Sequence, residues 1–340
     1  MKSIGLGLAA VVLVAVAAGA PVARGAGDAP VAWVNLSDPV IADLAKQDLK
    51  PGYAGPTAGV VADRTTGDVY MVVNDLGLWK SADRGRSFAR VADGKTVGGR
   101  CETAFALAAD PGGKRLMCFM IYGPSAMTPD AGKTWVPSKT SHLDYGAVDW
   151  TDGRAMIALR HESGGTACLT TDGGAVWKDL GKGFKGVGLF DGATLVALME
   201  KEPGIFRSTD GGANWKKVSE SKPTGFAMQV LKGVGYWTSA EGLLVSRDKG
   251  ATWSVLGSPV RAMQGPLFGK DERHLVVVGK EGFQETRDGG KTWRLAAPLP
   301  EGYNADHMTL CAWDPVGDVF YISRMTKPTM KFERAAAAKP

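Results

Sequence analysis

Several polar residues have the types that acid–base chemistry and anion recognition require, although they lie far apart along the chain. A tyrosine or histidine can act as a general base, and an arginine can neutralise a substrate carboxylate. If the protein is an enzyme, the candidates for the base are Tyr145, His161 and His307. The candidates for ligand binding are Arg100, Glu102, Arg160, Glu200 and Arg324. No motif specific to one reaction accompanies them, so their use depends on a fold that brings them together.

A repeat of about 40 residues organises the sequence. Six segments share the pattern Ser/Thr-x-Asp-x-Gly-x-x-Trp/Phe, and consecutive aspartates of the pattern are 38 to 47 residues apart. These aspartates are Asp83, Asp130, Asp172, Asp210, Asp248 and Asp288. Six occurrences in register indicate a repeated structural unit.

The residue types within the pattern predict a tight hairpin. The Asp carboxylate can accept hydrogen bonds from backbone N–H groups two or three residues on, and the Ser/Thr hydroxyl can help to close the loop. The glycine can adopt a positive φ, and the aromatic residue starts the returning strand and points into the core. One carboxylate per segment is too few for a calcium loop. We therefore expect structural aspartates and predict neither a metal nor a cofactor.

Pairs of apolar segments precede the hairpins, and each pair predicts two strands joined by a Gly- or Asp-rich turn. Examples are Ala104–Ala108 with Arg115–Met120, and Phe226–Val230 with Gly235–Thr238. Together with the two strands around the hairpin, each repeat predicts four antiparallel strands. Repeated units of this kind are typical of β-propeller blades.

A seventh strand pair without a hairpin follows the last repeat. It consists of Met308–Trp313 and Val319–Ser323, with Met330–Glu333 as a third strand. The segment 31–36 resembles the strand that follows each hairpin, so we expect it to supply the missing fourth strand. The sequence therefore predicts an all-β, seven-bladed propeller of four-stranded antiparallel blades, closed by the N-terminal strand.

The six hairpins resemble the Asp-box repeats of the BNR superfamily, which includes sialidases, xyloglucan-type glycosidases, sortilin-type receptors and photosystem assembly factors. The resemblance implies a propeller with the boxes on its outer rim, away from a central site, and it implies no activity. The Arg-Ile-Pro motif of sialidases is absent. Xyloglucan-type hydrolases use two propellers that face a cleft, which a single ring cannot form.

One face of a propeller is built from the segments that enter the first strand of each blade and those that join the second strand to the third. The candidate residues named above all fall in such segments, so we expect them to converge on one opening, the mouth. The alternative is that they are solvated loop residues. Two functions follow: a non-catalytic binding or assembly module for a protein or glycan, or a carbohydrate-active enzyme of the sialidase-like hydrolase or polysaccharide lyase type.

The first 25 residues predict a secretory signal peptide, with Lys2 before an apolar stretch and small residues before a cut after Gly25. We expect residues 26–334 to form the propeller and 335–340 a flexible tail. No later segment is apolar enough to cross a membrane. The protein is therefore predicted to be exported, either periplasmic or secreted, with no integral membrane segment after cleavage.

Composition agrees with this interpretation. Glycine is abundant, at 46 of 340 residues, which suits many short strands joined by turns. The formal net charge is +5 and no run of Lys or Arg forms a block, so no nucleic-acid partner is predicted. The spacing of the four cysteines matches no metal, haem or redox motif, and we expect them to be buried core residues, although disulfide pairing stays open.

Overall fold

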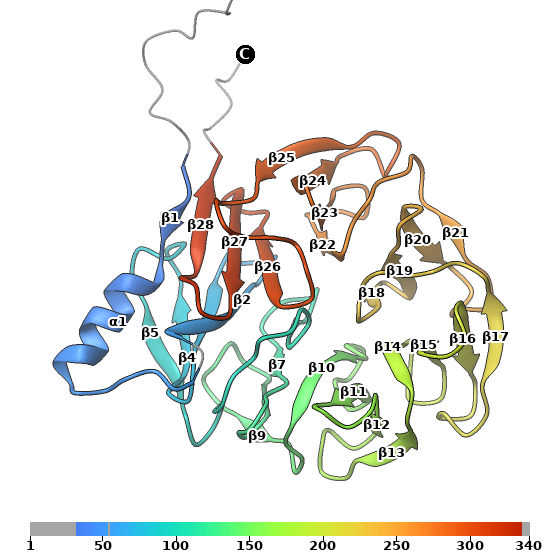
Figure 1. Ribbon diagram of the computed structural model, residues 1–340, viewed down its shortest axis with the longest axis horizontal. Helices are drawn as coiled ribbons and strands as arrows, with labels where there is room; N and C mark the ends of the chain where they lie inside the picture. The colour runs from blue at the N-terminus through green and yellow to red at the C-terminus, as the bar shows by residue number, and fades with distance from the viewer. Residues whose placement is uncertain (1–31, 54, 335–340) are drawn as a thin grey trace, which may run out of the picture. The chain divides into compact units, whose positions relative to one another are not determined.

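The computed structural model describes residues 32–53 and 55–334, and the predicted signal peptide and C-terminal tail lie outside them. The described residues form seven four-stranded sheets, arranged around a centre as the blades of a propeller (Figure 1). All neighbouring strands within the sheets are antiparallel, as in Gly146↔Ala158 of the third blade. The predicted all-β, seven-bladed propeller is confirmed.

Six blades each consist of four consecutive strands. Blade 1 contains β2 (Thr57–Ala62), β3 (Val69–Val73), β4 (Gly77–Ser81) and β5 (Ala89–Asp93). Blade 2 contains β6 (Leu107–Ala109), β7 (Leu116–Cys118), β8 (Ala126–Thr128) and β9 (Val136–Pro137). Blade 3 contains β10 (Leu143–Val148), β11 (Met156–Arg160), β12 (Ala167–Thr170) and β13 (Lys178–Gly181).

The next three blades repeat this order. Blade 4 contains β14 (Phe184–Leu189), β15 (Leu195–Met199), β16 (Ile205–Ser208) and β17 (Lys216–Ser219). Blade 5 contains β18 (Gln229–Leu231), β19 (Val234–Thr238), β20 (Leu243–Ser246) and β21 (Ser254–Val255). Blade 6 contains β22 (Gln264–Phe268), β23 (Leu275–Gly279), β24 (Gly282–Thr286) and β25 (Arg294–Pro298).

Blade 7 joins the two ends of the described chain. It contains β26 (Thr309–Asp314), β27 (Val319–Arg324), β28 (Met330–Glu333) and the N-terminal strand β1 (Val34–Asn35). Strand β1 pairs antiparallel with β28, with Val34 opposite Lys331. Beside it, the Trp33 ring lies 5.4 Å from the Phe332 ring. The predicted closure by the N-terminal strand is confirmed.

A buried hydroxyl network joins this closure to blade 1. The Thr329 hydroxyl forms hydrogen bonds with the Thr57 hydroxyl, with an O–O distance of 2.9 Å, and with the Ser323 hydroxyl, with an O–O distance of 3.0 Å. Ser37 Oγ accepts from the Thr329 backbone N–H at 2.6 Å and lies 3.2 Å from Thr57 Oγ1. Because buried polar groups are costly unless they are paired, this network fixes how the last blade meets the first.

A buried carboxylate ties blade 7 to blade 6. Glu285 on β24 is fully buried and lies within ion-pair distance of His274, Arg287, Arg294 and Arg334. Arg334 follows β28 directly and also contacts Asp318 of blade 7 at 2.6 Å. Burial alone would raise the pKa of Glu285, but hydrogen bonds from His274 and Arg334 outweigh burial and lower that pKa.

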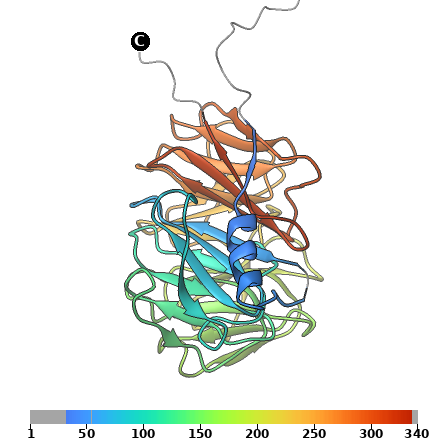
Figure 2. The same ribbon diagram turned by 90° about the vertical axis from the view of Figure 1, so that its left-hand side faces the viewer.

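One helix, which the sequence analysis did not predict, follows β1. Helix α1 (Ser37–Lys46) lies against the outside of blade 1 (Figure 2). Val40 and Leu44, one helical turn apart, are buried against Met71 and Trp79. The helical spacing of these two apolar residues is present in the sequence. The helix is only ten residues long and directly follows a strand, so the pattern is too short to predict a helix by itself. No helix of the described residues has the length and apolar composition of a membrane span.

Two first strands begin later than predicted. The strand expected over Ala104–Ala108 begins at Leu107, because Phe105 adopts a φ of 70° that is incompatible with a strand. The strand expected over Phe226–Val230 in blade 5 begins at Gln229. Before it, Ala227 forms a parallel bridge with Val187 of blade 4, so this segment pairs with blade 4 and not with blade 5. Both departures bring residues of the entering segments toward the centre of the ring.

The hairpins of the repeat have a common hydrogen-bond pattern. In blade 4, the Ser208 hydroxyl donates to Asp210 Oδ1 at 2.7 Å and accepts from the Gly212 N–H at 2.9 Å. Asp210 accepts from both the backbone N–H and the side-chain amide of Asn214. The carboxylate thus reaches four residues on, farther than predicted. Gly212 has a φ of 83°, which explains the glycine.

The aromatic residues of the repeats pack against the hydrophobic core, as expected, but they are half-buried and not fully enclosed. They are Phe88, Trp135, Trp177, Trp215, Trp253 and Trp293. Each precedes the outermost strand of its blade, where residues of its own blade or of the adjacent blade cover it only in part. Trp215 illustrates this position: its ring lies 5.4 Å from Phe184, and its indole N–H donates to the Gly212 carbonyl at 3.1 Å.

No disulfide joins the cysteines of the described residues. Cys101, Cys118 and Cys168 are buried, as expected of core residues, and Cys311 is half-buried. Burial raises the pKa of the Cys168 thiol to about 12. These thiols are therefore protonated at neutral pH.

We predict that acid destabilises the propeller between about pH 4 and about pH 2 through the hairpin aspartates. Hydrogen bonds from Asn214 and Ser208 lower the pKa of Asp210 from 3.8 to about 2. A depressed folded-state pKa gives stability that is complete above the unfolded value and is lost as pH falls through the folded value. The pKa values of Asp248 and Asp288 are likewise lowered to about 2. Thermal unfolding followed by circular dichroism between pH 2 and 6 measures the effect.

The variants Asp210→Asn and Asp172→Asn form a matched pair for this measurement. Asp172 has Val176 where Asp210 has Asn214, so it accepts no side-chain hydrogen bond from that position. We expect Asp210→Asn to flatten the acid dependence of the melting temperature more than Asp172→Asn. A melting temperature that stays constant from pH 4 to pH 2 would contradict the prediction.

A second prediction concerns the half-buried tryptophans. We expect Trp215→Ala to cost about 3 kcal/mol of unfolding free energy, the low end of the range for deleting a buried aromatic side chain. Trp237→Ala serves as the comparison and is expected to cost about 5 kcal/mol, because Trp237 is fully buried. Urea unfolding measures both, and equal costs would argue against the partial burial of Trp215.

Candidate functional site

The strand ends define two faces of the propeller. Leu143 at the start of β10 lies opposite Arg160 at the end of β11. In each blade, the segment before the first strand therefore lies beside the segment after the second strand. We call this side the entry face. The turns that join first to second strands, and the repeat hairpins, lie at the other ends of the strands, on the side that we call the box face.

An arginine held between two tyrosines marks the entry face of blades 1 and 2. The Arg100 guanidinium carbon lies 5.0 Å from the centre of the Tyr53 ring and 4.8 Å from that of Tyr122. Arg100 Nε also donates to Glu102 Oε2 at 2.6 Å. Tyr53 is 72% exposed and Tyr122 is 52% exposed. Arg100 thus organises a surface of aromatic rings with a charge fixed between them.

Blade 3 extends this surface. The rings of His142 and His161 meet the Tyr122 ring edge-on, with centroids 5.0 and 5.2 Å away. His161 Nδ1 lies 2.7 Å from Asp144 Oδ1, and His161 Nε2 lies 3.7 Å from Glu162 Oε1. We call the whole set the Arg100 cluster; it comprises Tyr53, Arg100, Glu102, Tyr122, His142, Asp144, His161 and Glu162.

The His161–Asp144 pair has the partners of a general base but not its access. Burial raises the pKa of Asp144, and the hydrogen bond with His161 opposes this rise. His161 Nε2 is buried and has no hydrogen-bond partner. The exposed Tyr122 ring packs against the imidazole. A substrate could therefore reach this nitrogen only after the side chains that cover it had moved.

The structure brings only some of the predicted site residues together. Arg100, Glu102 and His161 belong to the Arg100 cluster. Arg160 instead turns to Asp179 on the outermost strand of its blade, at 2.8 Å. Glu200 lines a separate hollow with Gly164, Lys182 and Phe206.

The proposed role of Tyr145 as a base does not fit its surroundings. The side chain is 5% exposed, and its hydroxyl donates to the Lys185 carbonyl at 3.0 Å. Burial raises the pKa of this phenol well above its ordinary value. Tyr145 stacks on Phe226 with ring centroids 4.9 Å apart and acts as a packing residue.

His307 and Arg324 belong to a second group, over the centre of the ring. The exposed His307 ring has its centre 5.4 Å from that of the Phe226 ring. The backbone carbonyl of His307 accepts a hydrogen bond from the Ala104 N–H at 2.8 Å. Arg324 pairs with Asp306 beside it. Entering segments of blades 2, 3, 5 and 7 therefore meet across the centre. The candidates therefore do not form the single group that was expected: His307 and Arg324 lie apart from the Arg100 cluster, and Arg160 and Glu200 have other surroundings.

The sequence analysis missed Tyr53, Tyr122 and His142. Tyr122 follows the second strand of blade 2, so the rule that selected Arg160 and His161 in blade 3 also selects it. No pattern marks Tyr53, which precedes β2 by several residues. Within the described residues, no group of three or more His, Cys, Asp or Glu side chains is placed to hold a metal ion.

Comparison with known proteins identifies the fold. Neither a protein-family model nor a curated protein matches the chain. Among solved structures, the chain is similar to the GH74 enzyme of Niastella koreensis, with 14% identity, a TM-score of 0.51, and coverage of 82% of this chain and 52% of that chain. It is also similar to YCF48 bound to D1 peptide, with 15% identity, a TM-score of 0.52, and coverage of 86% and 96%.

These neighbours are β-propellers, and at this level of identity they support the fold alone. The chain spans about half the length of the GH74 chain and nearly all of the YCF48 chain. Function has to be argued from the residues of the site.

We predict that His161→Ala destabilises the protein by about 1–3 kcal/mol, because it leaves the carboxylate of Asp144 without its partner. The Asp144 side chain is only 22% exposed, so water replaces the lost hydrogen bond poorly. His142→Ala is the control, because His142 is exposed and no hydrogen bond joins it to Asp144. Urea unfolding measures both variants, and an unchanged stability of His161→Ala would contradict a structural His161–Asp144 pair.

Proposed function

We propose that this protein is an exported, non-catalytic binding module that recognises a protein partner through the Arg100 cluster on its entry face. The observation that carries the proposal is the placement of Arg100 between Tyr53 and Tyr122. Arginine and tyrosine are the residue types that dominate binding energy at protein interfaces.

The exposed aromatic residues support this choice of surface. Among the large exposed hydrophobic residues of the described chain, the only aromatic ones are Tyr53 and Tyr122, and both contact Arg100. Other exposed apolar side chains, such as Val136 and Leu295, lie on outermost strands. Rigid aromatic rings lose little entropy on binding, and Arg100 is already oriented by Glu102.

The Arg100 cluster presents both a positive and a negative side chain, and this favours a polypeptide ligand. Arg100 supplies donors, while the exposed carboxylate of Glu162 lies at the edge of the cluster. A peptide offers both backbone polar groups and side chains of either charge. The YCF48 neighbour was solved with a D1 peptide, which supports peptide binding by a propeller of this size. A glycan ligand remains the second candidate for the same surface, because sugar rings also stack on exposed tyrosines.

A carbohydrate-active enzyme is the alternative function. The buried, unpartnered Nε2 of His161 favours it, and the GH74 neighbour is an enzyme. Against it, Tyr145 is buried and hydrogen-bonded, and Tyr122 packs over His161. The test is the rate at which the protein cleaves a panel of polysaccharides, by hydrolysis or by elimination. Cleavage by the wild type that is about 100- to 10,000-fold slower in His161→Ala would establish the enzyme and overturn the binding module.

We further infer that the repeat hairpins are Asp boxes of the BNR type with a structural role. Their shared pattern of hydroxyl, carboxylate and positive-φ glycine supports this, as in Thr286, Asp288 and Gly290 of blade 6. The inferred signal peptide supports export, and mass spectrometry of the mature N-terminus tests the expected cut after Gly25.

We predict that Tyr122→Ala weakens peptide binding by about 10- to 30-fold, the loss expected for truncation of an aromatic anchor at an interface. Peptides selected on the immobilised protein from a random display library provide the ligand, and isothermal titration calorimetry measures their affinity. A glycan array is run in parallel.

Leu295→Ala is the matched control, because Leu295 is 55% exposed and lies on β25, away from the entry segments of blades 1 to 3. Its affinity for the selected peptides should equal that of the wild type. Equal binding by Tyr122→Ala, or binding on the glycan array without any peptide binding, would contradict the proposed protein partner.

A further inference from the structure

A hollow of about 100 Å³ lies within the ring, between the first strands of several blades. Its lining runs from Phe105 and Gln264, near the entry face, to Arg64 and Pro111 in turns of the box face. The Tyr145–Phe226–His307 contacts cover the centre at the entry face. The hollow is therefore approached from the box face and is separate from the Arg100 cluster.

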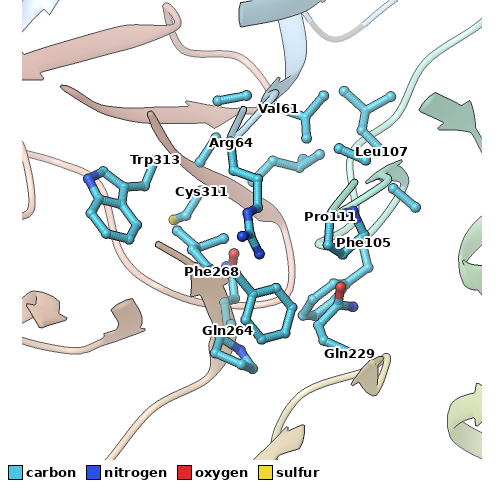
Figure 3. Close-up of a pocket in the computed structure, with 18 of the residues that line it drawn as sticks. Val61, Arg64, Phe105, Leu107, Pro111, Gln229, Gln264, Phe268, Cys311 and Trp313 are labelled. Carbon is cyan, nitrogen blue, oxygen red and sulfur yellow. The ribbon is translucent and has the colours of Figure 1, made fainter. Parts of the chain in front are cut away.

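Arg64 extends into this hollow (Figure 3). It starts from the turn between β2 and β3 in blade 1 and reaches the Lys270 carbonyl of blade 6, which accepts from Nη2 at 3.4 Å. Its Nη1 is buried and has no hydrogen-bond partner. Burial lowers the pKa of this guanidinium, but an arginine stays charged in proteins. The fold thus places a cation with one unpartnered donor beside this hollow.

The carboxylates nearest to Arg64 are already occupied. Asp63 accepts from the Thr65 hydroxyl at 2.7 Å, and Asp110 pairs with Arg115 at 2.6 Å. Asp271 accepts from the Arg273 N–H at 2.8 Å. Among the described residues, none of these carboxylates lies within ion-pair distance of Arg64. A buried charged donor without a protein partner is costly, so an acceptor from outside the chain, either water or a ligand, is favoured at Nη1.

The rest of the lining limits the size and charge of that acceptor. Phe105 and Phe268 add apolar side chains to the lining near the end of Arg64, and Gln229 lies beside Phe105 (Figure 3). A volume of about 100 Å³ admits a few waters or one small organic molecule. Asp63, Asp110 and Asp271 repel any anion, so a ligand charge is favoured only where it pairs directly with Arg64. A monoanion meets less of this repulsion than a phosphate or a dicarboxylate.

We propose that the hollow binds a small monocarboxylate, with the carboxylate on Arg64 and a short apolar body against Phe105 and Phe268. A carboxylate matches the planar fork of a guanidinium and supplies the acceptor that Nη1 lacks. The site is independent of the protein partner proposed for the entry face.

Isothermal titration calorimetry of the intact protein with sodium isobutyrate and sodium benzoate tests the proposal, with isobutyramide and benzamide as uncharged analogues. We expect at least one acid to bind and its amide to bind about 10- to 100-fold more weakly, because charge-assisted hydrogen bonds are lost. Arg64→Gln should lower the affinity of the protein for the acid by the same factor. Arg273→Gln is the control, since Arg273 is exposed in a turn of the same face and does not line the hollow.

A second measurement uses the wild-type protein alone, in case Arg64→Gln folds poorly. A bound acid should raise the melting temperature of the wild-type protein more than the same concentration of its amide does, because the acid binds the folded state more tightly. Absence of binding by both acids, equal binding of acid and amide, or equal affinity of the wild type and Arg64→Gln would overturn the proposal.

Discussion

The pairing of β1 with β28 is the constraint on which the rest of the fold depends. Seven blades close a ring only if the last one is completed, and the strand that completes it comes from the other end of the chain. The pairing covers the edge of β28, which would otherwise be exposed. Two further contacts secure it: the hydroxyl network around Thr329, which joins blade 7 to blade 1, and the buried Glu285, which joins Arg334 to blade 6. Opening the ring would leave the Thr329 hydroxyl or the Glu285 carboxylate without partners, which is unfavourable for buried polar groups.

Closure also separates two regions of different chemistry. At the entry face, aromatic side chains from segments far apart in the sequence meet over the centre, and the exposed polar groups are displaced toward blades 1 to 3. Tyr145 and Phe226 are covered by this arrangement, while Tyr53 and Tyr122 stay in solvent. Toward the box face, the same centre is left hollow, with Arg64 reaching from blade 1 to blade 6. A broad exposed surface suits a macromolecule, and an enclosed hollow suits a small one.

The repeat made most of the fold predictable. The hairpin pattern specifies both the turn and the strand that follows it, because Asp210 and Gly212 each have a conformational or hydrogen-bonding role that few other residues fill. The seventh blade followed from counting strands. Helix α1 was missed because tertiary contacts of Val40 and Leu44, more than local propensity, hold its ten residues. The site was predicted only in part. Topology selects which segments share a face, but whether a side chain such as Arg160 points to the face or back to Asp179 depends on packing that no single-sequence pattern encodes.

The position of β1 has a consequence for the order in which the protein folds. Val34 and its partner Lys331 are separated by nearly the whole described chain, so their contact has a very high sequence separation. Contacts of this kind form late and slowly, since the loop-closure entropy is paid before the contact contributes. Blades 1 to 6 can form in succession as the chain becomes available, whereas blade 7 has to wait for its last strand. For a chain that we propose is exported, the ring cannot close until β28 has crossed the membrane and reached β1.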